Sequence, residues 1–136
     1  MQYPRWLFVL SMTIGSVAAQ SCQVTIDGSQ PQDGSHYTAV VDPSCSAGVI
    51  RWMYPTGVLW VSFQQIQQSF TLCLRGGIGP FSQAVYHFTD TGPEQITSPT
   101  PDALTCVDAK DGKAIIKFEE PLFTTFQTVY EFSIVQ

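Results

Sequence analysis

The sequence predicts an all-β protein whose strands form an antiparallel sandwich. Three observations support this fold class. Short segments rich in β-branched and aromatic residues recur along the chain, and turn formers such as Asp33-Gly34 and Asp111-Gly112 separate them. No segment after the N-terminal apolar run keeps the 3.6-residue period of a helix. At 136 residues, the chain has the size of one domain.

The expected strands are His36–Val41, Val49–Met53, Val58–Phe63, Phe70–Leu74, Ala84–Phe88, Lys113–Phe118 and Val129–Val135. The last of them alternates apolar with polar positions. Two sets of its side chains should therefore face opposite ways. The sets are Val129, Glu131 and Ser133 against Tyr130, Phe132 and Ile134.

The segment Tyr54–Gly57 is expected to form a type I turn, because Pro55 presets φ at the second position. With strands on both sides, the sequence predicts a hairpin over Val49–Phe63. The second strand is apolar on both faces, so it is either covered on both sides or leaves an exposed patch. In the first case loops cover its outer face. In the second it belongs to an interaction surface formed by Arg51, Trp52, Tyr54 and Trp60.

Residues 1–19 are typical of a secretory signal peptide. Arg5 supplies the positive charge, Trp6–Ile14 the short apolar run, and Ser16–Ala19 the small residues before a cleavage expected between Ala19 and Gln20. The run is shorter than the roughly 20 residues of a spanning helix. The sequence therefore predicts a secreted, extracellular protein with no membrane insertion, whose single domain is residues 20–136.

The charge balance disfavours nucleic acid as a partner. The chain has 6 basic against 11 acidic residues and a formal net charge of −5. Phosphate binding needs a positive field, which this composition lacks. An acidic surface likewise gives no attraction to anionic membranes.

Secretion decides how the four cysteines are interpreted. Cys22, Cys45, Cys73 and Cys106 reach an oxidising compartment and should form two disulfides, for which three connectivities exist. Zinc is disfavoured, because the chain has no CxxC pair and neither histidine lies at ligand spacing to a cysteine.

One segment carries a family resemblance. The run Cys45–Gly57, CSAGVIRWMYPTG, resembles the CSAG-x-x-x-WMYPTG run of the meteorins, secreted proteins of animals. Leu72–Arg75 resembles the family's TVCIR, Ala84–Tyr86 with Thr91-Gly92 resembles NIYLEKTGE, and Cys106 stands where the family has its fourth cysteine. One departure is Val58–Val61, which contains Trp60 where the family has a smaller aliphatic pattern.

The resemblance implies a CUB-like β-sandwich of the jelly-roll type with sequential disulfides, Cys22–Cys45 and Cys73–Cys106. Meteorins are non-enzymatic secreted signalling proteins of neurogenesis and glial differentiation, with neurotrophic, growth-factor-like or cytokine-like activity. They carry a second, netrin-like domain after this region, and we expect the chain to correspond to the first domain alone.

Catalytic and cofactor chemistry finds little support in the sequence. The chain has no GxSxG elbow, and neither His36 nor His87 has an acid and a nucleophile beside it. We therefore predict no enzyme, no catalytic residue and no cofactor. Calcium is the one ion to consider, because CUB domains often bind it with loop acids. The alternative is that these aspartates stabilise their own turns. They are Asp27, Asp33, Asp42, Asp90, Asp108 and Asp111.

Two functions follow from these features. The first is a secreted signalling domain that binds a cell-surface receptor or another extracellular protein. The second is a structural or adhesive module that acts by self-association or by binding matrix. The sequence does not fix the oligomeric state that would separate them.

Expression in a secreting eukaryotic host should release a chain that begins at Gln20. Its intact mass should include no N-glycan, because the sequence contains no asparagine to carry one. N-terminal sequencing, mass spectrometry and a thiol assay check this. A retained leader or a titratable thiol would contradict the prediction.

Overall fold

The computed structural model describes residues 22–30, 34–77, 84–120 and 126–136. The predicted signal peptide lies outside them. The strands are β1 (Cys22–Asp27), β2 (His36–Val41), β3 (Ala47–Met53), β4 (Gly57–Gln64), β5 (Phe70–Gly76), β6 (Ala84–Thr89), β7 (Gly92–Ile96), β8 (Thr105–Ala109), β9 (Lys113–Glu120) and β10 (Gln127–Val135).

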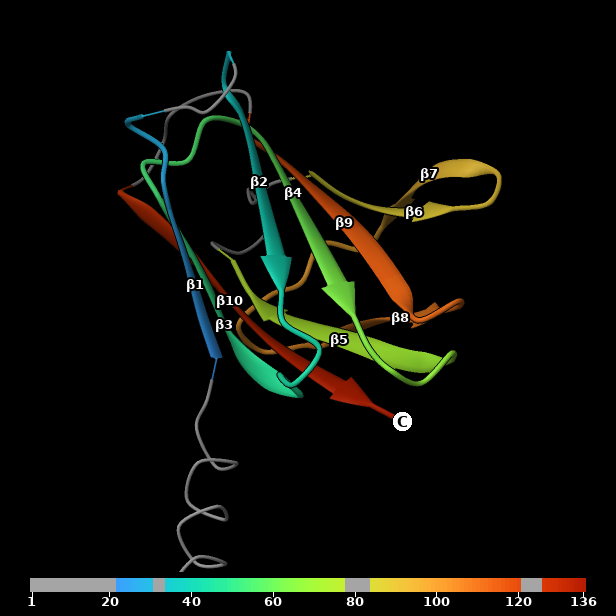
Figure 1. Cartoon of the computed structure of the whole chain (residues 1–136). Coiled ribbons are helices and arrows are strands. Elements are labelled where there is room, and N and C mark those ends of the chain that lie inside the picture. Colours follow the sequence, from blue (N-terminus) through green and yellow to red (C-terminus); the bar gives the residue numbers. More distant parts are fainter. Residues whose placement is uncertain (1–21, 31–33, 78–83, 121–125) are drawn as a thin grey trace, which may run out of the picture.

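The strands form two five-stranded sheets packed face to face (Figure 1). Sheet A has the order β1-β3-β10-β5-β8, and sheet B the order β2-β4-β9-β6-β7. The predicted all-β sandwich with two disulfides is therefore confirmed. Within the described ranges, no helix has the length and apolar character needed to cross a membrane.

Consecutive strands lie in opposite sheets, except for β6 and β7, which form a hairpin. The hairpin expected over Val49–Phe63 is therefore wrong, because β3 belongs to sheet A and β4 to sheet B. Tyr54 takes a left-handed φ of 52° where the chain crosses over. Gly57 has a φ of 90°, and a Cβ there would lie 2.2 Å from the backbone oxygen of Ser35. The crossover thus depends on a glycine at this position.

The same alternation makes both sheets mixed rather than wholly antiparallel. β1 pairs with β3 and β2 pairs with β4 in parallel, while the other neighbouring strands pair antiparallel. Each parallel pair consists of strands separated along the chain by one strand of the opposite sheet. A parallel pair needs a crossover connection of this kind and cannot be closed by a tight turn.

The core lies between the two sheets and is formed by alternate residues of each strand. On β10 the inward side chains are those of Tyr130, Phe132 and Ile134, as the alternation predicted. Trp52 on β3 is fully buried, and its ring meets that of Tyr37 edge-on at 6.0 Å between centroids. Further ring contacts across the core join Phe63 to Phe132 at 5.2 Å and Phe118 to Tyr130 at 4.6 Å.

Three strands were not expected from the sequence: β1, β7 and β8. Polar and exposed residues interrupt their apolar patterns. β1 and β8 are the two edges of sheet A, and each is tied to the sandwich by a disulfide. Cys22 of β1 bonds to Cys45 before β3, and Cys106 of β8 to Cys73 on β5. This is the sequential pairing that the resemblance implied.

Replacement of Trp52 by alanine should lower the free energy of unfolding by about 3–5 kcal/mol, since it empties a fully buried aromatic site. Urea unfolding followed by circular dichroism measures the loss. Val40→Ala is the control, because Val40 is 63% exposed and should change stability by no more than about 0.5 kcal/mol. Equal effects of the two substitutions would contradict the placement of Trp52 in the core.

Candidate functional site

The structure separates the four residues that were expected to form one interaction surface. Trp52 points inward from β3, is fully buried in the core and cannot contribute to a surface. Arg51 lies on the outer face of sheet A, where its Nη1 donates to Oε1 of Gln127 at 3.1 Å. Tyr54, 42% exposed, lies in the crossover between the sheets. Trp60 lies on the outer face of sheet B.

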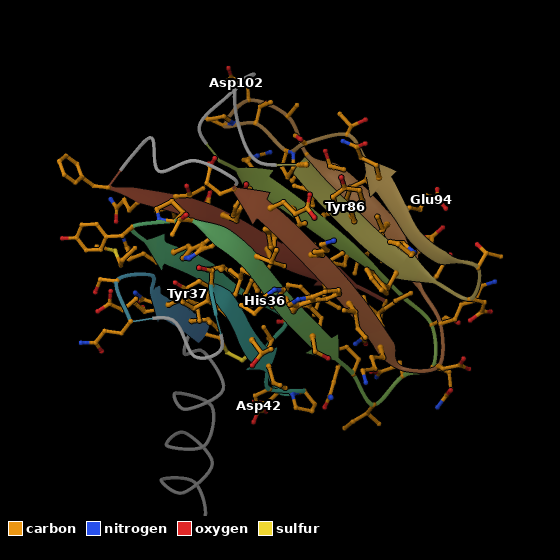
Figure 2. The ribbon with its side chains drawn as sticks, turned by 90° about the horizontal axis from the view of Figure 1, so that it is seen from above. His36, Tyr37, Asp42, Tyr86, Glu94 and Asp102 are labelled. Carbon is orange, nitrogen blue, oxygen red and sulfur yellow. A yellow bond between two sulfur atoms is a disulfide. The ribbon has the colours of Figure 1, made fainter. Side chains whose placement is uncertain are left out.

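Trp60 belongs to a cluster contributed by three strands of sheet B. The strand register places Lys117 of β9 opposite Trp60, and Tyr86 of β6 opposite Lys117. Phe88, two residues after Tyr86, points to the same side of the sheet. We call Trp60, Tyr86, Phe88 and Lys117 the aromatic face. Figure 2 shows Tyr86 and Glu94 on the β6–β7 side of the sandwich, and the register pairs Glu94 with His87 rather than with Tyr86.

The contacts within the aromatic face are close and directional. The rings of Trp60 and Phe88 meet edge-on, with centroids 4.9 Å apart. The Lys117 ammonium lies 5.4 Å from the Trp60 centroid and 5.0 Å from that of Tyr86, within cation–π range. Its Nζ also forms an ion pair with Glu119 at 2.7 Å. The lysine is therefore held between two rings and a carboxylate on the solvent side of the sheet.

Sequence reasoning identified Trp60 but missed its three partners. Tyr86, Phe88 and Lys117 each occupy an alternating position of an expected strand, so their facing could be read from the sequence. Their proximity depends on β9 lying between β4 and β6, which is a matter of strand order. The pattern along one strand carries no such information.

Beside the aromatic face, a cleft of about 420 Å³ opens between the ends of β6 and β9. We call it the β6–β9 cleft. Phe88 belongs both to this cleft and to the aromatic face, so the two are continuous. In Figure 1 the β6–β7 hairpin extends away from the sandwich while β9 stays with it. The cleft is lined by His87, Phe88, Thr89, Asp90, Asp108, Lys110, Asp111, Lys113 and Ile115.

Tight turns fix both walls of the cleft. At the β6–β7 turn, Oγ1 of Thr89 donates to the backbone oxygen of Gly92 at 3.1 Å and accepts from the backbone N–H of Thr91 at 3.3 Å. In the turn between β8 and β9, Asp111 and Gly112 both have positive φ, which is the type I′ pattern. The N–H of Gly112 also donates to the backbone oxygen of Gln68 at 2.9 Å. The cleft is thus preformed, which lowers the entropic cost of binding.

The charged groups of the cleft leave it slightly acidic. Three carboxylates, of Asp90, Asp108 and Asp111, line it together with the ammonium groups of Lys110 and Lys113. Burial lowers the pKa of His87 below its usual value of 6.5, against the opposing effects of Glu94 and Asp108. The imidazole is therefore neutral at pH 7. The cleft suits a ligand with positive rather than negative charge.

The aspartates considered for calcium are separated in the structure, and two of them, Asp27 and Asp108, lie on strands. Asp27 and Asp42 stabilise their own turns, since Oδ1 of each accepts hydrogen bonds from the backbone and hydroxyl of a serine two residues later. The cleft contains Asp90, Asp108 and Asp111. Asp33 lies outside the described residues. Among the residues that the structure covers, no three His, Cys, Asp or Glu side chains are grouped as metal ligands.

Comparison with known proteins yields structural likenesses alone. No family model and no curated protein matches the chain. The pre-peptidase C-terminal domain of a collagenase from Bacillus anthracis is 9% identical, with a TM-score of 0.40, over 85% of this chain and 96% of that one. A β-glucosidase from Paenibacillus barengoltzii is 10% identical, with a TM-score of 0.32, over 85% of this chain and 13% of that one.

The lowered pKa of His87 should make stability fall as the pH decreases from neutral. Between the unfolded pKa of about 6.5 and the lower folded value, the unfolded chain binds a proton that the folded chain does not. As the pH falls through this window, the contribution of His87 to the free energy of unfolding decreases. Below the folded pKa this contribution stays constant. Urea unfolding of wild type and His87→Gln from pH 7.5 to 5 measures the difference. A stability gain of the wild type on acidification, relative to the variant, would contradict it.

Proposed function

We propose that the chain is a secreted, non-enzymatic signalling protein that binds a cell-surface receptor or another extracellular protein. The signal-peptide pattern, the two disulfides and the resemblance to meteorins support this proposal. The single observation that carries it furthest is the aromatic face. Three aromatic side chains there lie on the outer side of a sheet, outside the core that stabilises the fold.

The chemistry of the aromatic face suits recognition of a protein. Tryptophan and tyrosine are enriched at binding hot spots, because they bury a large area and lose few rotamers. The contacts of Lys117 with Trp60, Tyr86 and Glu119 hold these side chains in place before a partner arrives. Binding then costs less side-chain entropy than ordering a free surface would.

A second candidate is an adhesive module that associates with itself. The observation in its favour is that both sheets are open: β1 and β8 are the edges of sheet A, and β2 and β7 those of sheet B, among the strands described. Exposed strand edges can pair between chains. Pro93 on β7 and the disulfides on β1 and β8 restrict this pairing, so receptor binding remains the leading proposal.

Trp60→Ala should weaken saturable binding of the purified chain to responsive cells by at least about tenfold, as expected for a hot-spot residue. Cell binding across a concentration series, on glial and non-neural cells, measures the effect. Phe126→Ala is the matched control, because Phe126 is a 74% exposed aromatic residue outside the aromatic face. Its removal should leave binding unchanged.

Two outcomes would count against receptor binding through this face. Folded Trp60→Ala that binds as tightly as the wild type would remove the face from recognition. Weak, unsaturable binding to every cell type, together with oligomers that grow with micromolar concentration, would favour the adhesive module.

A further inference from the structure

The geometry points to the β6–β9 cleft as a binding site for an extended peptide segment of a partner protein, with an apolar side chain next to a basic one. The segment lies between β6 and β9 and forms main-chain hydrogen bonds with them, in the manner of an added strand. The inference rests on the proposed function, since it gives the chemistry of the partner's segment.

The first support is an interrupted ladder within sheet B. β6 and β9 pair from Ala84–Glu119 to His87–Ile116, and the described register between them ends there. Yet both strands continue on their other sides: β9 stays paired with β4 as far as Lys113, and β6 with β7 as far as Thr89. The two strands remain extended while their facing edges separate.

Because the facing edges of β6 and β9 separate, backbone groups of both strands face the cleft. Successive residues of an antiparallel strand direct their N–H and C=O groups to alternate sides. The N–H of Lys113 donates to the backbone oxygen of Lys110 at 3.3 Å. Some of the other backbone groups at residues 113–115 and 88–89 face the cleft without a strand opposite them in the part of the chain described. An extended peptide supplies both the donors and the acceptors that such edges need.

The side chains around the cleft select the segment. Phe88 and Ile115 lie on the outer side of sheet B and form an apolar wall, whereas His87 faces inward. Asp108, on the edge strand of sheet A, adds a carboxylate. An extended peptide presents alternate side chains to opposite sides. A segment that alternates apolar with basic residues thus matches both sides of the cleft.

Size and charge agree with this occupant. A volume of about 420 Å³ falls in the range of ligand sites and takes a short segment rather than a folded surface. The cleft has three carboxylates against two ammonium groups, and the whole chain has a formal net charge of −5. Both favour a basic segment over an acidic one.

The test uses a blocked hexapeptide of alternating valine and lysine as its probe, added to the ¹⁵N-labelled, oxidised secreted chain. We expect saturable changes in the amide signals of residues 88–90 and 113–115, and slower hydrogen exchange there. N-methylation of every second peptide residue should weaken binding at least tenfold, since it removes main-chain donors. Replacement of the lysines by glutamates should weaken it by a similar factor.

Matched variants separate the cleft from the rest of the surface. Ile115→Lys should weaken binding of the probe at least tenfold. Val40→Lys also replaces an apolar β-branched residue by lysine, but on β2, outside the cleft, and it should have no effect. Asp111→Asn keeps a residue that tolerates the left-handed backbone there and should weaken binding severalfold. Asp102→Asn, which removes the same charge elsewhere, should not. If Ile115→Lys fails to fold, the aspartate pair decides the question.

The inference is overturned if the probe gives no saturable change at these residues up to about 1 mM, or if N-methylation leaves its affinity unchanged. Equal effects of Ile115→Lys and Val40→Lys would also overturn it. Cell binding that depends on Trp60 without peptide binding would remove this inference and leave the proposed function intact. Peptide binding without any dependence of cell binding on Trp60 would support this inference and remove the aromatic face, not the cleft, from recognition.

Discussion

The structure depends on aromatic side chains that join one sheet to the other through the core. Among the described residues, the buried ring contacts Tyr37–Trp52, Phe63–Phe132 and Phe118–Tyr130 each pair a strand of sheet B with a strand of sheet A. Large rings bury much apolar area, and the edge-on contacts of the first two pairs add to that gain. Because almost every connection crosses between the sheets, these contacts also hold β2, β4 and β9 of one sheet against β3 and β10 of the other.

The same alternation that fills the core decides which residues remain for recognition. On β4, Leu59, Val61 and Phe63 are fully buried, so Trp60 between them must face outward. Its ring is stabilised there by Phe88 and Lys117 rather than by the core. The aromatic face can therefore change in sequence with little effect on the packing between the sheets. A surface of this kind can specialise for a partner without loss of the fold.

The two sheets differ in how their edges are held. Disulfides tie both edge strands of sheet A, whereas sheet B has none and its β6–β7 hairpin separates from β9 beyond His87. The cleft lies where sheet B loses its regular pairing, and the type I′ turn before β9 holds the opposite wall. Sheet A thus provides a fixed support, and sheet B carries both features proposed for binding.

The sequence by itself determined the all-β class and the strands whose apolar and polar residues alternate strongly. Within each of these strands it also determined which side chains share a face. Alternation is a local property, because successive side chains of a strand point to opposite sides whatever lies beside it.

The sequence could not determine that β3 and β4 belong to different sheets, because a turn such as Tyr54–Gly57 is compatible with a hairpin and with a crossover. The hairpin left open an interaction surface that includes Trp52, but Trp52 lies on the inward side of β3 and is fully buried. Only the tertiary structure placed Tyr86 and Lys117 beside Trp60 and opened a cleft between β6 and β9, since both depend on strand order and on where a ladder ends. These are contacts between segments far apart in the chain, and no local pattern encodes them.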